Sequence, residues 1–304
     1  MKLFQYIVCV ITVSSIPVFP QSGIESFLKP ADSLHKQRRN AVVITEAIGV
    51  SGALVGLNEL WYKDYPRSKF HFINDNDQWL QMDKMGHTYS AYHIGSAGAS
   101  LLQWSWATKK QKLIYGSTLG FAFLTAVEVL DGYSQKWGAS GGDVIANATG
   151  TGLYVSQELL WNEQRIIPKF SFHTTSYTEI RPELLGKSLN EQVLKDYNGQ
   201  TYWLSANVHS FFKASKIPKW LNVAVGYGAD GMVTGDNEFP MNPEIPVIKR
   251  YRQFYFSFDA DLTKIETKSH VLKTFFSIFN LVKIPAPAIE IGVNRRIKGY
   301  FIYF

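Results

Sequence analysis

Residues 113–130 read LIYGSTLGFAFLTAVEVL, an apolar stretch that carries no charge before Glu128. Three further stretches share this character: residues 41–57, 87–107 and 144–161. Each is close to the roughly 20 residues that a buried or bilayer-crossing helix needs. Together they predict a mainly α protein whose N-terminal part is a four-helix bundle.

Two architectures for this bundle remain open. Every stretch contains more polar residues than a plain lipid-facing span, so the bundle is either embedded in a bilayer or soluble with helices buried on most sides. Small residues such as Gly95 and Gly98 allow close helix packing in both cases. Three lysines between the second and third stretches favour the membrane only slightly.

From residue 169 onward the pattern changes to a period of two. Apolar residues alternate with polar or small ones at 221–227, 254–259 and 289–294, as expected for half-buried strands. Residues 270–284 instead have a helical period, with flanking lysines, and fit either a membrane interface or a helix that covers the sheet. We therefore expect a smaller α+β region with antiparallel strands.

The N-terminus indicates export. Lys2 precedes an uncharged run and a proline-containing polar stretch, which is the pattern of a secretory signal, with an uncleaved anchor as the alternative. The one cysteine, Cys9, lies inside that run, too early for a lipidation site. The expected division is a signal peptide at 1–22, a linker at 23–40, the bundle at 41–168 and the C-terminal region at 169–304.

Composition and charge indicate which classes of binding partner to expect. Of 304 residues, 46% are apolar, 14% aromatic and only 18% charged, which excludes a disordered chain or a coiled coil. The net charge of +6 comes from dispersed lysines and arginines without a basic-aromatic stripe, so nucleic-acid binding is disfavoured. A membrane lipid or another envelope component is the expected partner.

Polar residues gather at three predicted helix ends. Asp83 and His87 share one helical face at the start of the second stretch, and Asp143 and Asn147 do so at the start of the fourth. Glu128, with Asp131 three residues on, closes the third. Short loops make sequential helices antiparallel neighbours, so all three pairs should lie in one layer.

This layer admits three interpretations. His87 could act as a general base oriented by Asp83 or Asp143. Alternatively, His87, Glu128 and Asp143 could bind a divalent metal, although one histidine is poor for zinc. In the third interpretation the layer is structural: Lys84 neutralises the acids and Asp143 caps a helix.

The order of these motifs resembles known families. Asp83-Lys84-x-x-His87, Glu128 before Gln135, and Asp143-x-x-x-Asn147-x-x-Gly150 are similar to the helix motifs of VanZ-like proteins. Together with residues 194–205 and 220–232, the chain more closely resembles domain-of-unknown-function family 2279, described as predicted periplasmic lipoproteins with a YfiM-like branch. This resemblance extends from about residue 40 to the end and implies location and site residues, but no reaction, metal or cofactor.

We therefore expect an exported, membrane-associated protein of the cell envelope, in the periplasm or at the outer membrane. In the leading hypothesis the acid–histidine layer is structural or binds a ligand, with Lys84, Asp131, Asn147 and Gly150 as ligand-binding positions. In the alternative, the protein is an acid/base or metal-dependent hydrolase or transferase acting on a lipid or lipid-linked envelope precursor. Its catalytic residues would be His87, Asp83, Glu128 and Asp143.

Overall fold

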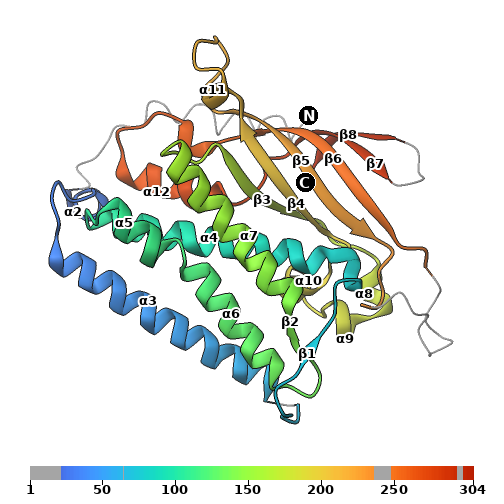
Figure 1. Cartoon of the computed structure of the whole chain (residues 1–304). Helices are drawn as coiled ribbons and strands as arrows, with labels where there is room; N and C mark the ends of the chain where they lie inside the picture. Colours follow the sequence, from blue (N-terminus) through green and yellow to red (C-terminus); the bar gives the residue numbers. More distant parts are fainter. Residues whose placement is uncertain (1–21, 64, 236–247, 293–296) are drawn as a thin grey trace.

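A computed structural model describes residues 22–63, 65–235, 248–292 and 297–304. The protein has an α+β fold in which a layer of helices packs against a six-stranded antiparallel sheet (Figure 1). The expectation of a mainly α protein with a four-helix bundle and a small β part is therefore wrong. The sheet is a principal layer of the fold, and the helices use it to bury their apolar surface.

Three long helices form the helical layer: α4 (Met82–Trp104), α6 (Leu119–Gly132) and α7 (Gly141–Leu160) pack against one another. The turn η3 (Gln78–Gln81) precedes α4, and α5 (Lys109–Gln111) with the π-helical turn η4 (Lys112–Gly116) joins α4 to α6. A two-stranded parallel sheet, β1 (Phe72–Ile73) with β2 (Ala139–Ser140), holds the loop before η3 against the start of α7.

Close approach between these helices depends on glycine. A Cβ atom on Gly150 of α7 would lie 2.1 Å from the carbonyl oxygen of Thr88 on α4, and one on Gly95 would lie 2.3 Å from that of Ser117. Real Cβ atoms do not approach so closely, so the backbones touch only because these side chains are missing. Gly150, expected as a ligand-binding position, is thus a packing residue between two helices.

The helix α3 (Lys36–Leu57) lies along the outside of this layer and continues into the π-helical turn η2 (Asn58–Tyr62). Val42 is its one buried residue, whereas Val43, Ile44, Ile48 and Val55 are exposed. By length and composition alone, α3 and the segment Lys109–Gly132 could each cross a membrane. Because α3 contributes almost nothing to the core, the four apolar stretches do not enclose a bundle core of their own.

The region expected as a linker has regular structure. Residues 23–40 contain most of α2 (Ser22–Leu28) and the first turn of α3. The Glu25 carboxylate of α2 accepts hydrogen bonds from the backbone N–H of His270 at 2.7 Å and of Val271 at 3.4 Å, at the start of a distant helix. The signal peptide, with Cys9, lies outside the described residues except for Ser22.

The large sheet is an antiparallel meander in which each strand pairs with the next (Figure 1). Its strands are β3 (Ile166–Phe172), β4 (Gln200–Asn207), β5 (Leu221–Asp230), β6 (Tyr251–Ala260), β7 (Ala286–Gly292) and β8 (Lys298–Tyr303). The free edge of β3 is covered, because Phe170 exchanges backbone hydrogen bonds with residues 281 and 283 just before β7. The sheet therefore curls back on itself at one end.

Short helices fill the connections. Between β3 and β4 lie α8 (Tyr177–Ile180), α9 (Pro182–Leu185) and α10 (Leu189–Lys195), and between β4 and β5 lies α11 (Val208–Phe211). The turn η5 (Leu262–Lys264) and α12 (His270–Phe279) connect β6 to β7. The helix predicted within 270–284 thus covers 270–279, and it packs against α2 and η5 with most of its apolar residues exposed.

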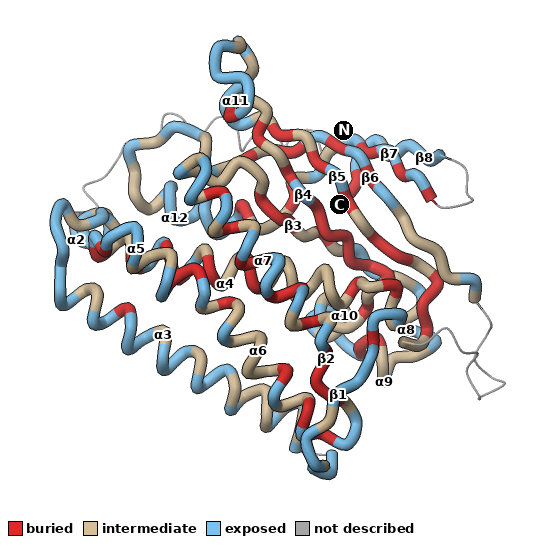
Figure 2. Tube along the Cα trace, in the orientation of Figure 1, coloured by how far each residue is buried: buried red, intermediate tan, exposed pale blue. Residues whose placement is uncertain are grey.

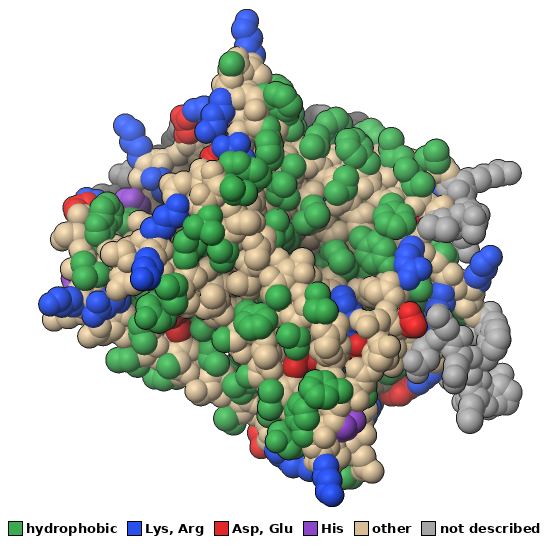
Figure 3. Space-filling model, viewed as in Figure 1, with side chains coloured by type: hydrophobic (Ala, Val, Ile, Leu, Met, Phe, Trp, Pro, Cys, Tyr) green, Lys and Arg blue, Asp and Glu red, His purple; other side chains and the backbone are tan. Residues whose placement is uncertain are grey.

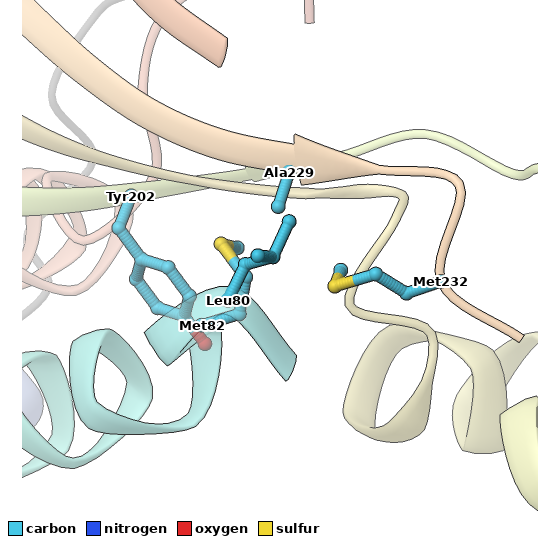
Figure 4. Close-up of a cluster of buried hydrophobic side chains, with 5 residues drawn as sticks. All are labelled: Leu80, Met82, Tyr202, Ala229 and Met232. Carbon is cyan, nitrogen blue, oxygen red and sulfur yellow. The ribbon is translucent and has the colours of Figure 1, made fainter. Parts of the chain in front are cut away.

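The start of α4 is anchored to the sheet. Leu80 and Met82 pack against Tyr202 of β4 and Ala229 of β5, with Met232 closing the cluster (Figure 4). Buried residues concentrate where α4 and α7 face each other and along the strands, whereas α3 is mostly exposed (Figure 2). This contact fixes the N-terminal turn of α4, which carries three of the predicted site residues.

Candidate functional site

A left-handed turn leads into α4. Trp79, Leu80 and Gln81 have φ angles of 49°, 50° and 65°, a conformation that non-glycine residues rarely adopt. The turn is held by hydrogen bonds from the Trp79 N–H to the Gly235 carbonyl and from the Tyr227 hydroxyl to the Leu80 carbonyl. Strained backbone of this kind persists only where the surroundings over-determine it, and it is frequent beside functional sites.

The sites predicted on three helices do come together. Asp83, Lys84 and His87 lie in the first two turns of α4, Glu128 and Asp131 in the last turns of α6, and Asp143 and Asn147 in the first two turns of α7. We call these seven residues, together with Asp75, the acid–histidine cluster. Gln135 is not among them, because it is exposed in the loop after α6.

Lys84 is the centre of the acidic side of the cluster. Its Nζ lies 2.7 Å from Asp75 Oδ2, 3.0 Å from Asp143 Oδ1 and 3.9 Å from Asp83 Oδ2. The Lys84 side chain is only 13% exposed. Burial opposes its charge, but the adjacent carboxylates outweigh that effect and raise the pKa of Lys84. One ammonium group is therefore shared by three acids.

Ser140 caps α7, so Asp143 does not. The Ser140 Oγ accepts from the backbone N–H of Asp143 at 3.1 Å and donates to Asp75 Oδ1 at 2.6 Å. Its backbone N–H donates to Glu128 Oε2 at 2.9 Å. With the cap supplied by Ser140, the Asp143 carboxylate is left free to face Lys84 and His87.

His87 joins the three helices. Its Nδ1 lies 3.0 Å from Asn147 Oδ1, and its Nε2 lies 3.8 Å from Glu128 Oε1. One ligand atom each from Asp83, His87 and Asp143 lie within 4.8 Å of one another, a spacing that could hold a metal ion. The buried Asn147 Nδ2 has no hydrogen-bond partner within the described part of the chain. The amide nitrogen is thus an unused donor beside His87.

Three partners of the cluster were not predicted. Asp75 follows β1 in a loop, while Tyr62 and Tyr197 come from η2 and from the turn after α10. The Tyr62 hydroxyl donates to Asp131 at 2.8 Å and the Tyr197 hydroxyl to Asp83 at 2.6 Å. None of the three lies at a helical spacing from the other site residues, so periodicity offered no signal for them.

Three carboxyl groups of the cluster hold their protons unusually well. Burial raises the pKa of Glu128 to about 7 and those of Asp131 and Asp143 to about 6. Burial opposes the charged form of His87, but Asp83 and Asp143 outweigh it and raise the pKa of the imidazole. The described residues place five carboxyl groups around one lysine and one histidine, so the cluster has an excess of acid.

Comparison with known proteins gives one match. Residues 71–158 match the family model described as "Predicted periplasmic lipoprotein (DUF2279)". That segment contains α4, α6 and most of α7 with the whole acid–histidine cluster, but not the large sheet. No curated protein and no solved structure matches the chain. The VanZ-like part of the resemblance has no support among these matches.

The match agrees with the export signal in the sequence. It places the protein in the cell envelope, associated with a membrane. The matched family is defined by its predicted location and not by a reaction, so the chemistry of the site has to be argued from the cluster itself.

Proposed function

We propose that this envelope protein is a ligand-binding protein and that its acid–histidine cluster binds a divalent cation. The observation that carries the proposal is the convergence of Asp83, His87 and Asp143 from two helices, with ligand atoms within 4.8 Å of one another. Two carboxylates and an imidazole suit a cation such as Mn²⁺ better than zinc, which favours nitrogen and sulfur ligands.

The charge balance supports a cation. With five carboxyl groups against one lysine and one histidine, a bound cation would favour the ionised form of Asp143, whose pKa is raised to about 6 by burial and by the neighbouring Asp83. Lys84 would not have to leave the cluster, since Asp75 binds it more closely than Asp143 does. The Asp83 side chain is 31% exposed, against 11% for Asp75 and 5% for Asp143, and offers the route of entry.

The test is a titration of the full chain with Mn²⁺. Binding is measured by calorimetry and by the paramagnetic resonance signal of Mn²⁺. We expect saturable binding to one site, weakened about tenfold or more in Asp83→Asn and in His87→Gln. Asp32→Asn is the matched control, because the Asp32 side chain is 88% exposed and forms a salt bridge with the exposed Lys29. Equal binding by all three variants would exclude the site.

The same variants separate ligand binding from a purely structural role. If His87→Gln lowers the melting temperature sharply while the wild-type protein shows no saturable Mn²⁺ binding, the cluster only holds three helices together. If His87→Gln folds normally but no longer binds Mn²⁺, the role of the cluster is ligand binding.

A second candidate is acid/base chemistry on a lipid or lipid-linked envelope precursor. It is favoured by Glu128, whose pKa of about 7 is close to the operating pH of a general acid or base, and whose carboxylate faces His87 at 3.8 Å. Glu128→Gln tests it: loss of turnover of a lipid-linked phosphate with retained Mn²⁺ affinity would support a hydrolase or transferase.

A further inference from the structure

The outer face of the sheet carries the start of α4 at Tyr202, Tyr227 and Ala229, and the rest of this face on β5 to β7 is apolar and exposed. Strand register aligns Val225, Phe256 and Ile289 in one row across β5, β6 and β7, and Phe254 with Ile291 in the adjacent row. Hydrophobic side chains gather into a broad surface over this part of the molecule (Figure 3). The apolar strip, as we call it, consists of Leu204, Val225, Phe254, Phe256, Phe258, Ile289 and Ile291, each between 41% and 54% exposed.

The opposite face of the same strands is buried and mixed: it carries an aromatic cluster around Trp203 and Tyr255 together with an unusual number of polar residues. Ser205, Asn222, Ser257, Asp259 and Glu290 alternate with the strip residues and are all at most 4% exposed. In a water-facing sheet the alternation runs the other way, with apolar residues inside. Strands with polar residues inside and apolar residues outside are those that face lipid.

We propose that the apolar strip inserts into one leaflet of a lipid bilayer and that the sheet thereby holds the protein at the membrane surface. The length of the strip limits how deeply it can insert into the bilayer. From Phe254 to Phe258 is four residues, or about 14 Å at ~3.4 Å per residue. That is about half of the ~30 Å hydrocarbon core, so the strip reaches into one leaflet and does not cross the bilayer.

The chemistry of the strip favours lipid over a second protein. Protein–protein interfaces are only about as apolar as the rest of a protein surface and carry hydrogen-bonding groups throughout. On β5 to β7, the positions that face outward carry no acid, and their one charged residue, Arg252, donates a hydrogen bond to Gln81 Oε1 at 2.6 Å. An apolar surface without acids suits hydrocarbon, and the net charge of +6 suits a membrane with anionic headgroups.

The inference does not depend on the cation site, and a spin label tests it directly. The chain has one cysteine, so a Cys9→Ser background permits a single nitroxide at Phe256→Cys. The matched control is Leu194→Cys on α10, where the native side chain is 65% exposed but lies outside the strip. The full chain is mixed with vesicles of phosphatidylethanolamine and phosphatidylglycerol, and collisions with a water-soluble nickel chelate and with oxygen are measured.

We expect vesicles to lower the accessibility of the label at 256 to the nickel chelate about tenfold or more, because a polar complex is excluded from hydrocarbon. Accessibility to oxygen should rise, and the label at 194 should change little. An unchanged label at 256 in vesicle-bound protein would overturn the proposal, since another surface would then make the contact. Spin–spin broadening between labels at 256 would also overturn it and assign the strip to a second copy of the chain.

A second measurement does not need a label. Phe256→Ser with Phe258→Ser should reduce co-flotation with the same vesicles several-fold, while Leu194→Ser should float as the wild type does. Both positions are outward and exposed, so the double variant should keep the wild-type circular dichroism spectrum. Undiminished flotation of the folded double variant would contradict the proposal.

Discussion

The helical layer and the sheet bury charged groups in opposite ways. In the sheet interior, Lys169 and Asp259 form an ion pair of 2.8 Å with both side chains fully buried. Lys283 lies over the Trp203 ring at 4.7 Å, and Glu290 accepts a hydrogen bond from Gln253. The described sheet interior thus balances two lysines against two carboxylates, whereas the acid–histidine cluster has more acids than bases.

The difference indicates which region is structural and which is available to a ligand. A balanced and sealed set of charges mainly satisfies itself, so it specifies how the strands pack. An unbalanced set that is partly open, as at Asp83, gains most from a further cation. The cluster therefore differs from the sheet interior in having buried acids that outnumber the bases, and the following predictions test that distinction.

Breaking the sheet pair should have the largest effect. Asp259→Asn removes the charge that neutralises Lys169, and it also weakens the acceptor for the Ser205 hydroxyl at 2.6 Å. We expect the free energy of unfolding to fall by about 3–5 kcal/mol, because an uncompensated charge stays buried. Urea denaturation measures it.

The control is Glu266→Gln, which breaks an exposed pair with Lys219 and should leave stability unchanged within error. If the two variants lose similar stability, the sheet interior is not a sealed ionic core.

The contact between the helical layer and the sheet should make the stability of the protein depend on pH. His93 of α4 donates from Nε2 to the Pro168 carbonyl of β3 at 2.7 Å, and burial lowers its pKa from 6.5 to about 4. Below pH 6.5 the unfolded chain takes up a proton that the folded chain does not, so stability is complete above 6.5 and falls toward pH 4. We expect this histidine to account for about 2–3 kcal/mol of that loss.

His93→Gln keeps a donor for the same carbonyl and removes the titration. Thermal unfolding between pH 4 and 6.5 should therefore show a shallower slope in the variant than in the wild-type protein. Parallel slopes would mean that His93 titrates alike in the folded and unfolded chains.

Periodicity in the sequence found the cluster and three strands of the sheet, at 221–227, 254–259 and 289–294, but not the size of the sheet. A spacing of four residues placed Asp83 with His87 and Asp143 with Asn147 on common faces, and the helices did bring the two pairs together. The sheet was underestimated because its polarity is inverted: a strand such as β3, with Lys169 pointing inward, does not look like a core strand. Loop residues such as Asp75 reach the cluster through tertiary folding alone, which spacing along one element cannot reveal.

Within the helical layer, packing should matter more than any single polar contact. Gly150→Ala would place a methyl group 2.1 Å from the Thr88 carbonyl oxygen, so α7 would have to move away from α4. We expect a loss of about 1–3 kcal/mol in thermal or urea unfolding. Gly152→Ala, two residues along the same helix and facing open space, should instead stabilise the protein by up to about 1 kcal/mol. Equal effects of the two variants would show that α4 and α7 can separate freely.

The smallest expected effect concerns the edge of the cluster. Tyr62→Phe removes the hydroxyl that donates to Asp131 at 2.8 Å, and we expect a loss of about 1 kcal/mol in the free energy of unfolding. The lost donor should also raise the pKa of Asp131 further above about 6, which carbon-detected NMR of the carboxyl group would follow. Tyr65→Phe is the matched control: its hydroxyl contacts the exposed Lys136, so stability should change by less than about 0.5 kcal/mol. An unchanged Asp131 titration in Tyr62→Phe would mean that burial alone holds the proton, and that the excess of acid is a property of the helices and not of their hydrogen-bond partners.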